Sequence, residues 1–154
     1  MTDITVLDIL AEAKKLAHQY HQLTGKPLGI TGEVAEYEAS RILGIDLTSA
    51  RQAGYDATEI RDGQLFRLQI KGRRILNGSS SSERLGAIDL NKEFDAVLLV
   101  LLDSNFETTA IYVASRAVVI AALKTPGSKS RNDRGKLGIS KFKSIGDIRW
   151  QRPT

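Results

Sequence analysis

Two polar side chains occupy alternate positions on a predicted strand of this 154-residue chain. In Leu65–Ile75 (LFRLQIKGRRI), a strand would direct Gln69 and Lys71 to the same face, about 6 to 7 Å apart. Two acids that could join them, Asp56 and Glu33, lie earlier in the chain. Carboxylate and amide oxygens suit Mg²⁺, and a nearby lysine can steady an attacking water or offset charge on a reacting phosphate. These residue types therefore predict metal-dependent hydrolysis of a phosphodiester bond.

A β-hairpin is needed to bring these side chains together, and the sequence contains the signals of one. The dipeptide Asp62-Gly63 is favoured in two-residue hairpin turns. After it, the chain alternates as expected of a half-buried strand, with the apolar Phe66, Leu68 and Ile70 on one face and Leu65, Arg67, Gln69 and Lys71 on the other. Pairing of this strand with the segment before the turn would place Asp56 close to Gln69 and Lys71.

A helix is expected to supply the remaining acid. Thr31 is predicted to cap a helix that continues to Leu43 and ends at Gly44. Glu33 lies in its first turn, and Glu36, about one turn further, is the alternative if Glu33 faces away. Acids in a first turn also stabilise the positive end of a helix, so a purely structural role stays open for both.

The remaining pattern predicts a single α/β domain, residues 1–154. Thr5-x-x-Asp8 is similar to a capping box at the start of a helix that ends at Gly25. Two further strands and a short helix are predicted at residues 94–102, 109–113 and 117–123, and no regular element is predicted for the basic segment 124–154. This order of elements favours an α/β sandwich around one mixed sheet.

Three short motifs follow one another in the chain. They are Gly29-x-x-Gly32-Glu33-x-Ala35, Gly54-Tyr55-Asp56 and Leu68-Gln69-Ile70-Lys71. In this order they resemble the restriction-endonuclease-like superfamily, often named for its PD-(D/E)XK motif, with residues 29–102 as the core and 1–25 and 124–154 as additions. The resemblance implies a three-layer sandwich, with a central mixed β-sheet flanked by helices, and an endonuclease that uses Mg²⁺ or Mn²⁺.

The resemblance also implies a role for each motif residue. Glu33, Asp56 and Gln69 would hold the metal, and Lys71 would complete the catalytic set. Two positions depart from the family pattern: Tyr55 replaces the usual proline, and Gln69 replaces the usual Asp or Glu. Glutamine also occurs in active branches as a neutral ligand, but the lost charge is equally compatible with weaker metal binding. A catalytically inactive module that binds nucleic acid or a protein partner is therefore the alternative function.

Positive charge is concentrated towards the C-terminal end. The formal net charge is +4, yet residues 124–149 alone carry +6 and the rest of the chain −2. Such a segment predicts contact with a polyanion, here the backbone of DNA, with a solvated tail as the alternative. The predicted nucleic-acid contacts are Arg73, Arg74, Lys129, Arg131, Arg134, Lys136, Lys141 and Lys143.

Composition excludes several other classes of protein. The chain has no cysteine, which excludes disulfides, thiolate nucleophiles and cysteine-held metals. No apolar run is long enough for a membrane span, and the N-terminal residues do not resemble a signal peptide, so a cytoplasmic protein is expected. No separate recognition domain is evident, so sequence-specific cleavage would require a homodimer or a separate partner.

Overall fold

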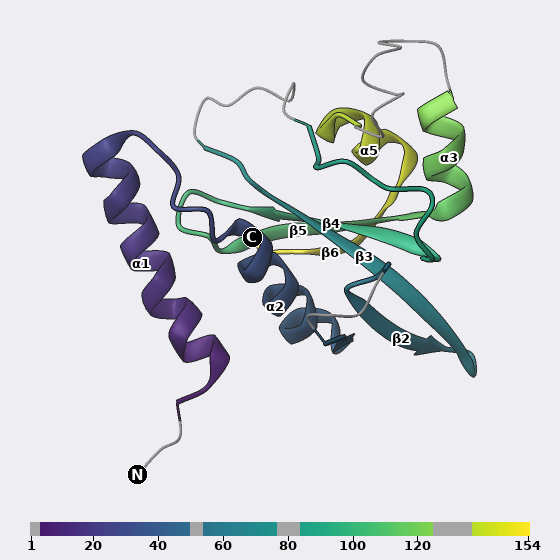
Figure 1. Cartoon of the computed structure of the whole chain (residues 1–154), viewed down its shortest axis with the longest axis horizontal. Helices are drawn as coiled ribbons and strands as arrows, with labels where there is room; N and C mark the ends of the chain where they lie inside the picture. The colour runs from purple at the N-terminus through teal and green to yellow at the C-terminus, as the bar shows by residue number, and fades with distance from the viewer. Residues whose placement is uncertain (1–3, 50–53, 77–83, 125–136) are drawn as a thin grey trace.

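The computed structural model describes residues 4–49, 54–76, 84–124 and 137–154 (Figure 1). Its helices are α1 (Val6–Thr24), α2 (Thr31–Leu43), α3 (Arg116–Lys124) and α5 (Ile139–Ile145). Its strands are β1 (Asp46–Leu47), β2 (Ala57–Arg61), β3 (Gln64–Arg74), β4 (Ala96–Leu102), β5 (Thr108–Ser115) and β6 (Asp147–Gln151). Among the described residues, every helix is too short or too polar to cross a lipid bilayer.

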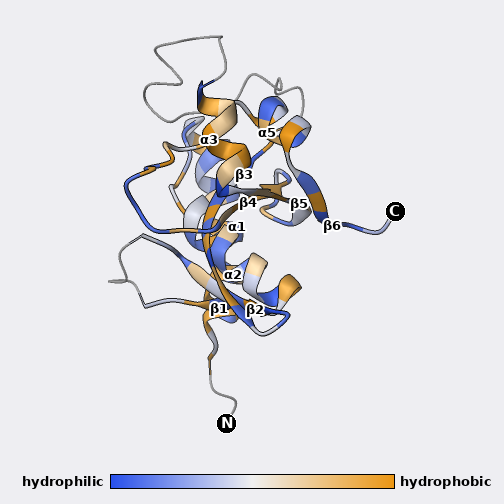
Figure 2. Cartoon of the chain, turned by 90° about the vertical axis from the view of Figure 1, so that its right-hand side faces the viewer, coloured by the Kyte–Doolittle hydropathy of each residue, from blue (hydrophilic) through white to orange (hydrophobic). Residues whose placement is uncertain are grey.

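The strands form one six-stranded sheet in which neighbours in the sheet are also neighbours in the chain, in the order β1-β2-β3-β4-β5-β6. β3 and β4 run parallel, with Lys71 opposite Leu99, and the other pairs are antiparallel. The sheet has α2 on one face and α3 and α5 on the other, as Figures 1 and 2 show from two directions. The predicted α/β class and mixed sheet are thus confirmed.

β4 belongs to the hydrophobic cores on both faces of the sheet. All of its residues are buried, and successive side chains of a strand point to opposite faces. Leu98 and Val100 pack in the core that includes α2, whereas Val97 and Leu99 pack in the core that includes α3 and α5. The continuous apolar run in the sequence is explained by a strand that is covered on both sides.

β2 and β3 form the predicted hairpin. Asp62 and Gly63 both have a positive φ, 51° and 79°, as the type I′ turn requires. The register pairs Ala57 with Leu68, and the backbone N–H of the preceding Asp56 donates to the Leu68 carbonyl at 2.8 Å. The hairpin therefore continues to the point where the predicted site residues lie.

α2 approaches β3 closely at Gly72. A Cβ added to Gly72 would lie 2.5 Å from the Cβ of Ala35 and 3.2 Å from the backbone oxygen of Thr31. Ala35 is fully buried. Glycine therefore sets the distance between the helix and the strand that carries Gln69 and Lys71.

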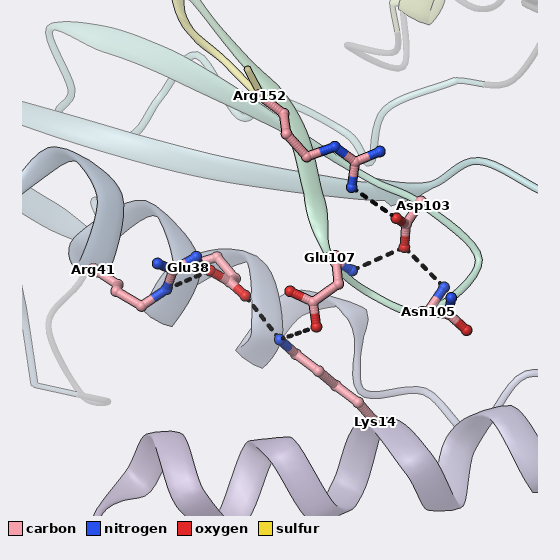
Figure 3. A network of polar contacts seen from close by, with 7 residues as sticks. All are labelled: Lys14, Glu38, Arg41, Asp103, Asn105, Glu107 and Arg152. Carbon is pink, nitrogen blue, oxygen red and sulfur yellow. Dashed lines mark hydrogen bonds and ion pairs between the residues drawn. The ribbon is translucent and has the colours of Figure 1, made fainter. Parts of the chain in front are cut away.

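α1 is tied to α2 largely by charged side chains. Ala17 is its only fully buried residue among those described. The Lys14 ammonium donates to Glu38 at 2.7 Å and to Glu107 at 3.5 Å, and Glu38 also accepts a hydrogen bond from Arg41 (Figure 3). These bonds compensate the burial of the Glu38 carboxylate, because an unpaired charge would be costly at that position.

The boundaries of α1 agree with the prediction from the sequence, whereas α2 begins one residue earlier than predicted. Thr5 and Asp8 form the predicted capping box, and Gly25 ends the helix with a φ of 70°. α2 already begins at Thr31, and Ile30 occupies the cap position without a side-chain hydrogen bond. The predicted cap at Thr31 is therefore wrong.

The end of the chain is more structured than its composition indicates. α5 and β6 both lie within residues 137–154, where the sequence predicts no helix or strand. β6 pairs with β5, and Trp150 lies opposite Ile111 and packs against the core. The prediction failed because charged side chains interrupt both apolar patterns.

Candidate functional site

Asp56 lies directly before β2, where its carboxylate is fixed by backbone groups. Its Oδ2 accepts a hydrogen bond from the Ile70 N–H at 2.7 Å. Its own carbonyl accepts from the Thr48 N–H at 2.9 Å, and its N–H donates to Leu68. The acid is therefore held beside β3 by strand pairing on both sides.

Gln69 is buried, with 6% of its surface exposed. Its Nε2 donates to the Gly54 carbonyl at 3.2 Å, which leaves Oε1 buried without a donor among the described residues. Gly54 has a φ of 99°, and an added Cβ would lie 3.2 Å from backbone atoms of Glu93. The close packing of Gly54 thus fixes an amide whose oxygen has spare capacity to accept, which is costly unless a ligand or water satisfies it.

Lys71 lies on the same face of β3 as Gln69 and is half-buried. Its Nζ donates to the Ala87 carbonyl at 2.9 Å. Burial lowers the pKa of Lys71 below its usual range; Asp56 opposes this decrease, while Lys92 and Arg73 add to it. The lysine is therefore a held cation with a reduced preference for its proton.

These three side chains line one polar pocket of about 130 Å³. The sequence places them together correctly. It does not indicate Asp89 and Lys92, which also line the pocket. Both lie in the connection from β3 to β4, and nothing in their local pattern shows that this connection passes over β3.

The structure separates the roles of the two acids on α2. Glu33 is exposed, whereas Glu36 is half-buried. Burial raises the pKa of Glu36 to about 6, and the Asp56 and Glu33 carboxylates add to the increase. Glu36 therefore interacts electrostatically with Asp56, but neither glutamate lines the polar pocket.

A cluster of acidic or histidine ligands is not formed at this place. Among the described residues, no group of three or more His, Asp or Glu side chains could hold a metal ion. Among the residues that line the pocket, Asp56 and Asp89 have carboxylate oxygens and Gln69 has a neutral amide oxygen. The predicted ligand Glu33 remains outside the pocket in this arrangement.

The predicted nucleic-acid contacts occupy different places. Arg73 and Arg74 line a second hollow at the end of β3. Lys141 and Lys143 are exposed on α5, and Lys143 lies 5.6 Å from the centre of the Tyr112 ring. The other four, Lys129, Arg131, Arg134 and Lys136, lie outside the described residues.

Comparison with known proteins leaves the function to be inferred from this chain. No protein-family model matches the sequence, and a search of curated proteins finds no significant match.

Proposed function

We propose that the protein is a metal-dependent nuclease that hydrolyses phosphodiester bonds in DNA with Mg²⁺ or Mn²⁺. The observation that carries this proposal is Gln69, which lines the same pocket as Asp56 and Lys71 and whose buried Oε1 has no donor among the described residues. A hard cation would satisfy that oxygen, whereas an apolar ligand would leave it unpaired.

The donor set is compatible with such a cation. Mg²⁺ in phosphoryl-transfer sites is held by one or two carboxylates and keeps several waters or substrate oxygens. Asp56 and Gln69 supply protein oxygens, and Asp89 lines the same pocket. When bound, the metal would polarise the phosphate and favour ionisation of a water molecule.

Lys71 has the position of an electrostatic partner for the reacting phosphate. One of its three N–H donors is used by Ala87, which fixes the side chain and leaves the others for phosphate oxygens. The Ile70 N–H holds the Asp56 carboxylate, which is therefore already positioned near this cation before a substrate binds. The residues thus support phosphodiester hydrolysis by water.

A catalytically inactive module that binds nucleic acid is the second candidate, and two observations favour it. Glu33 is exposed, and the described residues contain no cluster of three acidic or histidine ligands. A binding module would need the basic surface but not the polar pocket.

Cleavage of supercoiled plasmid and of single-stranded DNA with Mg²⁺ or Mn²⁺ distinguishes the two candidates. Asp56→Asn keeps an acceptor for Ile70 but removes the charge, and Lys71→Ala removes the cation. Each should lower the cleavage rate about a hundredfold or more. Lys15→Ala, at an exposed position on α1, is the matched control and should cleave normally.

Wild-type protein that shifts DNA on a gel but never cleaves it would contradict the nuclease and support the binding module. Thermal melting of each variant ensures that a loss of cleavage does not reflect unfolding.

A further inference from the structure

A second hollow, which we call the arginine cleft, lies at the end of β3. It has a volume of about 380 Å³, and its lining includes Arg73, Arg74, Arg84, Thr31 and Phe106. Sites for small ligands occupy roughly 300 to 1,000 Å³. The arginine cleft is thus large enough for a ligand of nucleotide size.

Within the part of the chain that the structure describes, no carboxylate neutralises the charge of the arginine cleft. Among the described residues, no acid lines it and none of its three arginines forms an ion pair with a carboxylate. Elsewhere Arg67 and Arg149 pair with acids. Asp103 attracts Arg74 electrostatically, but the Asp103 carboxylate already accepts a hydrogen bond from Arg152. The excess positive charge favours an anionic ligand.

Two of the arginines are held in place and still have donors to offer. Arg74 donates its Nε to the Ser104 carbonyl at 3.0 Å and lies 4.4 Å from the centre of the Phe106 ring. Arg73 donates its Nε to the Arg84 carbonyl. A guanidinium has five N–H donors, so these bonds fix each group and leave further N–H groups for a phosphate.

The start of α2 adds backbone donors near the arginine cleft. Ile30 occupies the cap position and supplies no side-chain acceptor, so the first N–H groups of the helix are not capped by a side chain. Thr31 and Gly29 line the arginine cleft. An uncapped helix start strengthens the attraction for phosphate that the arginines provide.

The arginine cleft also has an apolar part to its lining. Pro27, Leu28, Leu76 and Phe106 all contribute to it. Inorganic phosphate alone would leave this surface uncovered, whereas a sugar and base attached to the phosphate would cover it. The lining therefore favours a phosphorylated nucleoside.

The arginine cleft adjoins the polar pocket. Arg73 follows Lys71 by two residues on β3, so their side chains lie on one face about 6 to 7 Å apart at Cα. Both also hold the same segment of the β3–β4 connection, since Lys71 donates to Ala87 and Arg73 donates to Arg84. A strand end bound in the arginine cleft would lie beside the polar pocket.

We propose that the arginine cleft binds the terminal phosphate monoester of a nucleic-acid strand. The role of this phosphate in placing a bond for hydrolysis rests on the proposed nuclease function, but its binding does not require cleavage.

Fluorescence anisotropy in EDTA, where no metal-dependent cleavage occurs, tests the binding directly. The probes are short single-stranded DNA oligonucleotides of one sequence with a 5′-phosphate, a 3′-phosphate or hydroxyl groups at both ends. One of the phosphorylated ends should bind about tenfold more tightly than the hydroxyl ends, as expected for charge-assisted hydrogen bonds. Equal affinity for all three probes overturns the proposal.

Substitutions then locate the effect. Arg84→Gln and Arg74→Lys should reduce the preference for the phosphorylated end to about twofold or less, because each loses guanidinium donors. Arg74→Lys keeps the positive charge, and Arg61→Gln on the exposed end of the hairpin is the matched control. Preference that persists in both cleft variants overturns the assignment to the arginine cleft, provided that thermal melting shows them folded.

A free deoxynucleoside monophosphate distinguishes a strand end from a free ligand. It should compete only at far higher concentration than the phosphorylated oligonucleotide, and equal potency overturns the assignment to a strand end. If the protein cleaves plasmid DNA but binds oligonucleotides with phosphorylated and hydroxyl ends equally, only this inference is contradicted. Preference in a protein that never cleaves DNA contradicts only the nuclease.

Discussion

Substitution of Gly72 by alanine should destabilise the protein by displacing α2 from the sheet. The new methyl would lie 2.5 Å from the Ala35 Cβ, whereas carbon atoms attract best at about 3.5 to 4.0 Å. The Thr31 carbonyl at 3.2 Å limits movement to the side. The helix must therefore move outward by about 1 Å or more, and overpacking of this kind costs about 1 to 3 kcal/mol.

Urea denaturation followed by circular dichroism measures this cost. The set comprises wild type, Gly72→Ala, Ala35→Gly and the double variant, with Gly32→Ala as control. Gly32 lies on α2 with open space around the added Cβ, so alanine there should be neutral or stabilise by up to about 1 kcal/mol. Because Ala35→Gly removes the facing methyl, the double variant should be more stable than additivity predicts by about 1 kcal/mol.

The close-packing explanation fails if Gly72→Ala unfolds at the same urea concentration as wild type. It also fails if the two substitutions are simply additive, since the clash would then lie elsewhere.

Two further substitutions concern the ionisable and amide groups of the site. Glu36 has a folded-state pKa of about 6 against an ordinary value of 4.5, so its ionisation opposes folding and stability falls as pH rises through this window. The free energy of unfolding of Glu36→Gln should equal that of wild type below pH 4.5 and exceed it by about 1 kcal/mol near neutral pH, a value reduced for solvent screening because the group is half-exposed. Denaturation curves that give the same difference in stability at both pH values would contradict this prediction. Gln69→Glu should bind Mn²⁺ more tightly in calorimetry, yet lose about 1 to 3 kcal/mol of stability in EDTA because it cannot donate to Gly54. Unchanged stability in EDTA would contradict the assigned amide orientation.

Local chemistry made part of the fold and site predictable. Asp62-Gly63 fixed the hairpin because both residues tolerate a positive φ, and the hairpin register then brought Asp56 to Gln69. The alternation along β3 placed Lys71 on the same face. The continuous apolar run of β4 required cover on both faces, and the structure supplies it.

The remaining features depend on contacts between distant segments. Glu33 and Glu36 have the same type and nearly the same place in the sequence, and only the packing of α2 on β3 decides which is half-buried. Asp89 reaches the polar pocket because β3 and β4 are parallel, which forces their connection across the sheet. Arg149 in β6 pairs with Glu59 in β2, a contact that no local pattern contains.

The strand order has a consequence for the kinetics with which the chain acquires its structure. Hairpins such as β2–β3 join neighbouring segments and form on a timescale of about 1 to 10 μs, whereas the parallel pair β3–β4 must first bring together two strands that are separated by residues 75–95 in the sequence. We expect this pairing to be the later step. The polar pocket takes Asp56, Gln69 and Lys71 from one hairpin and Asp89 from the crossing loop. It is therefore complete only after the two halves of the sheet have joined.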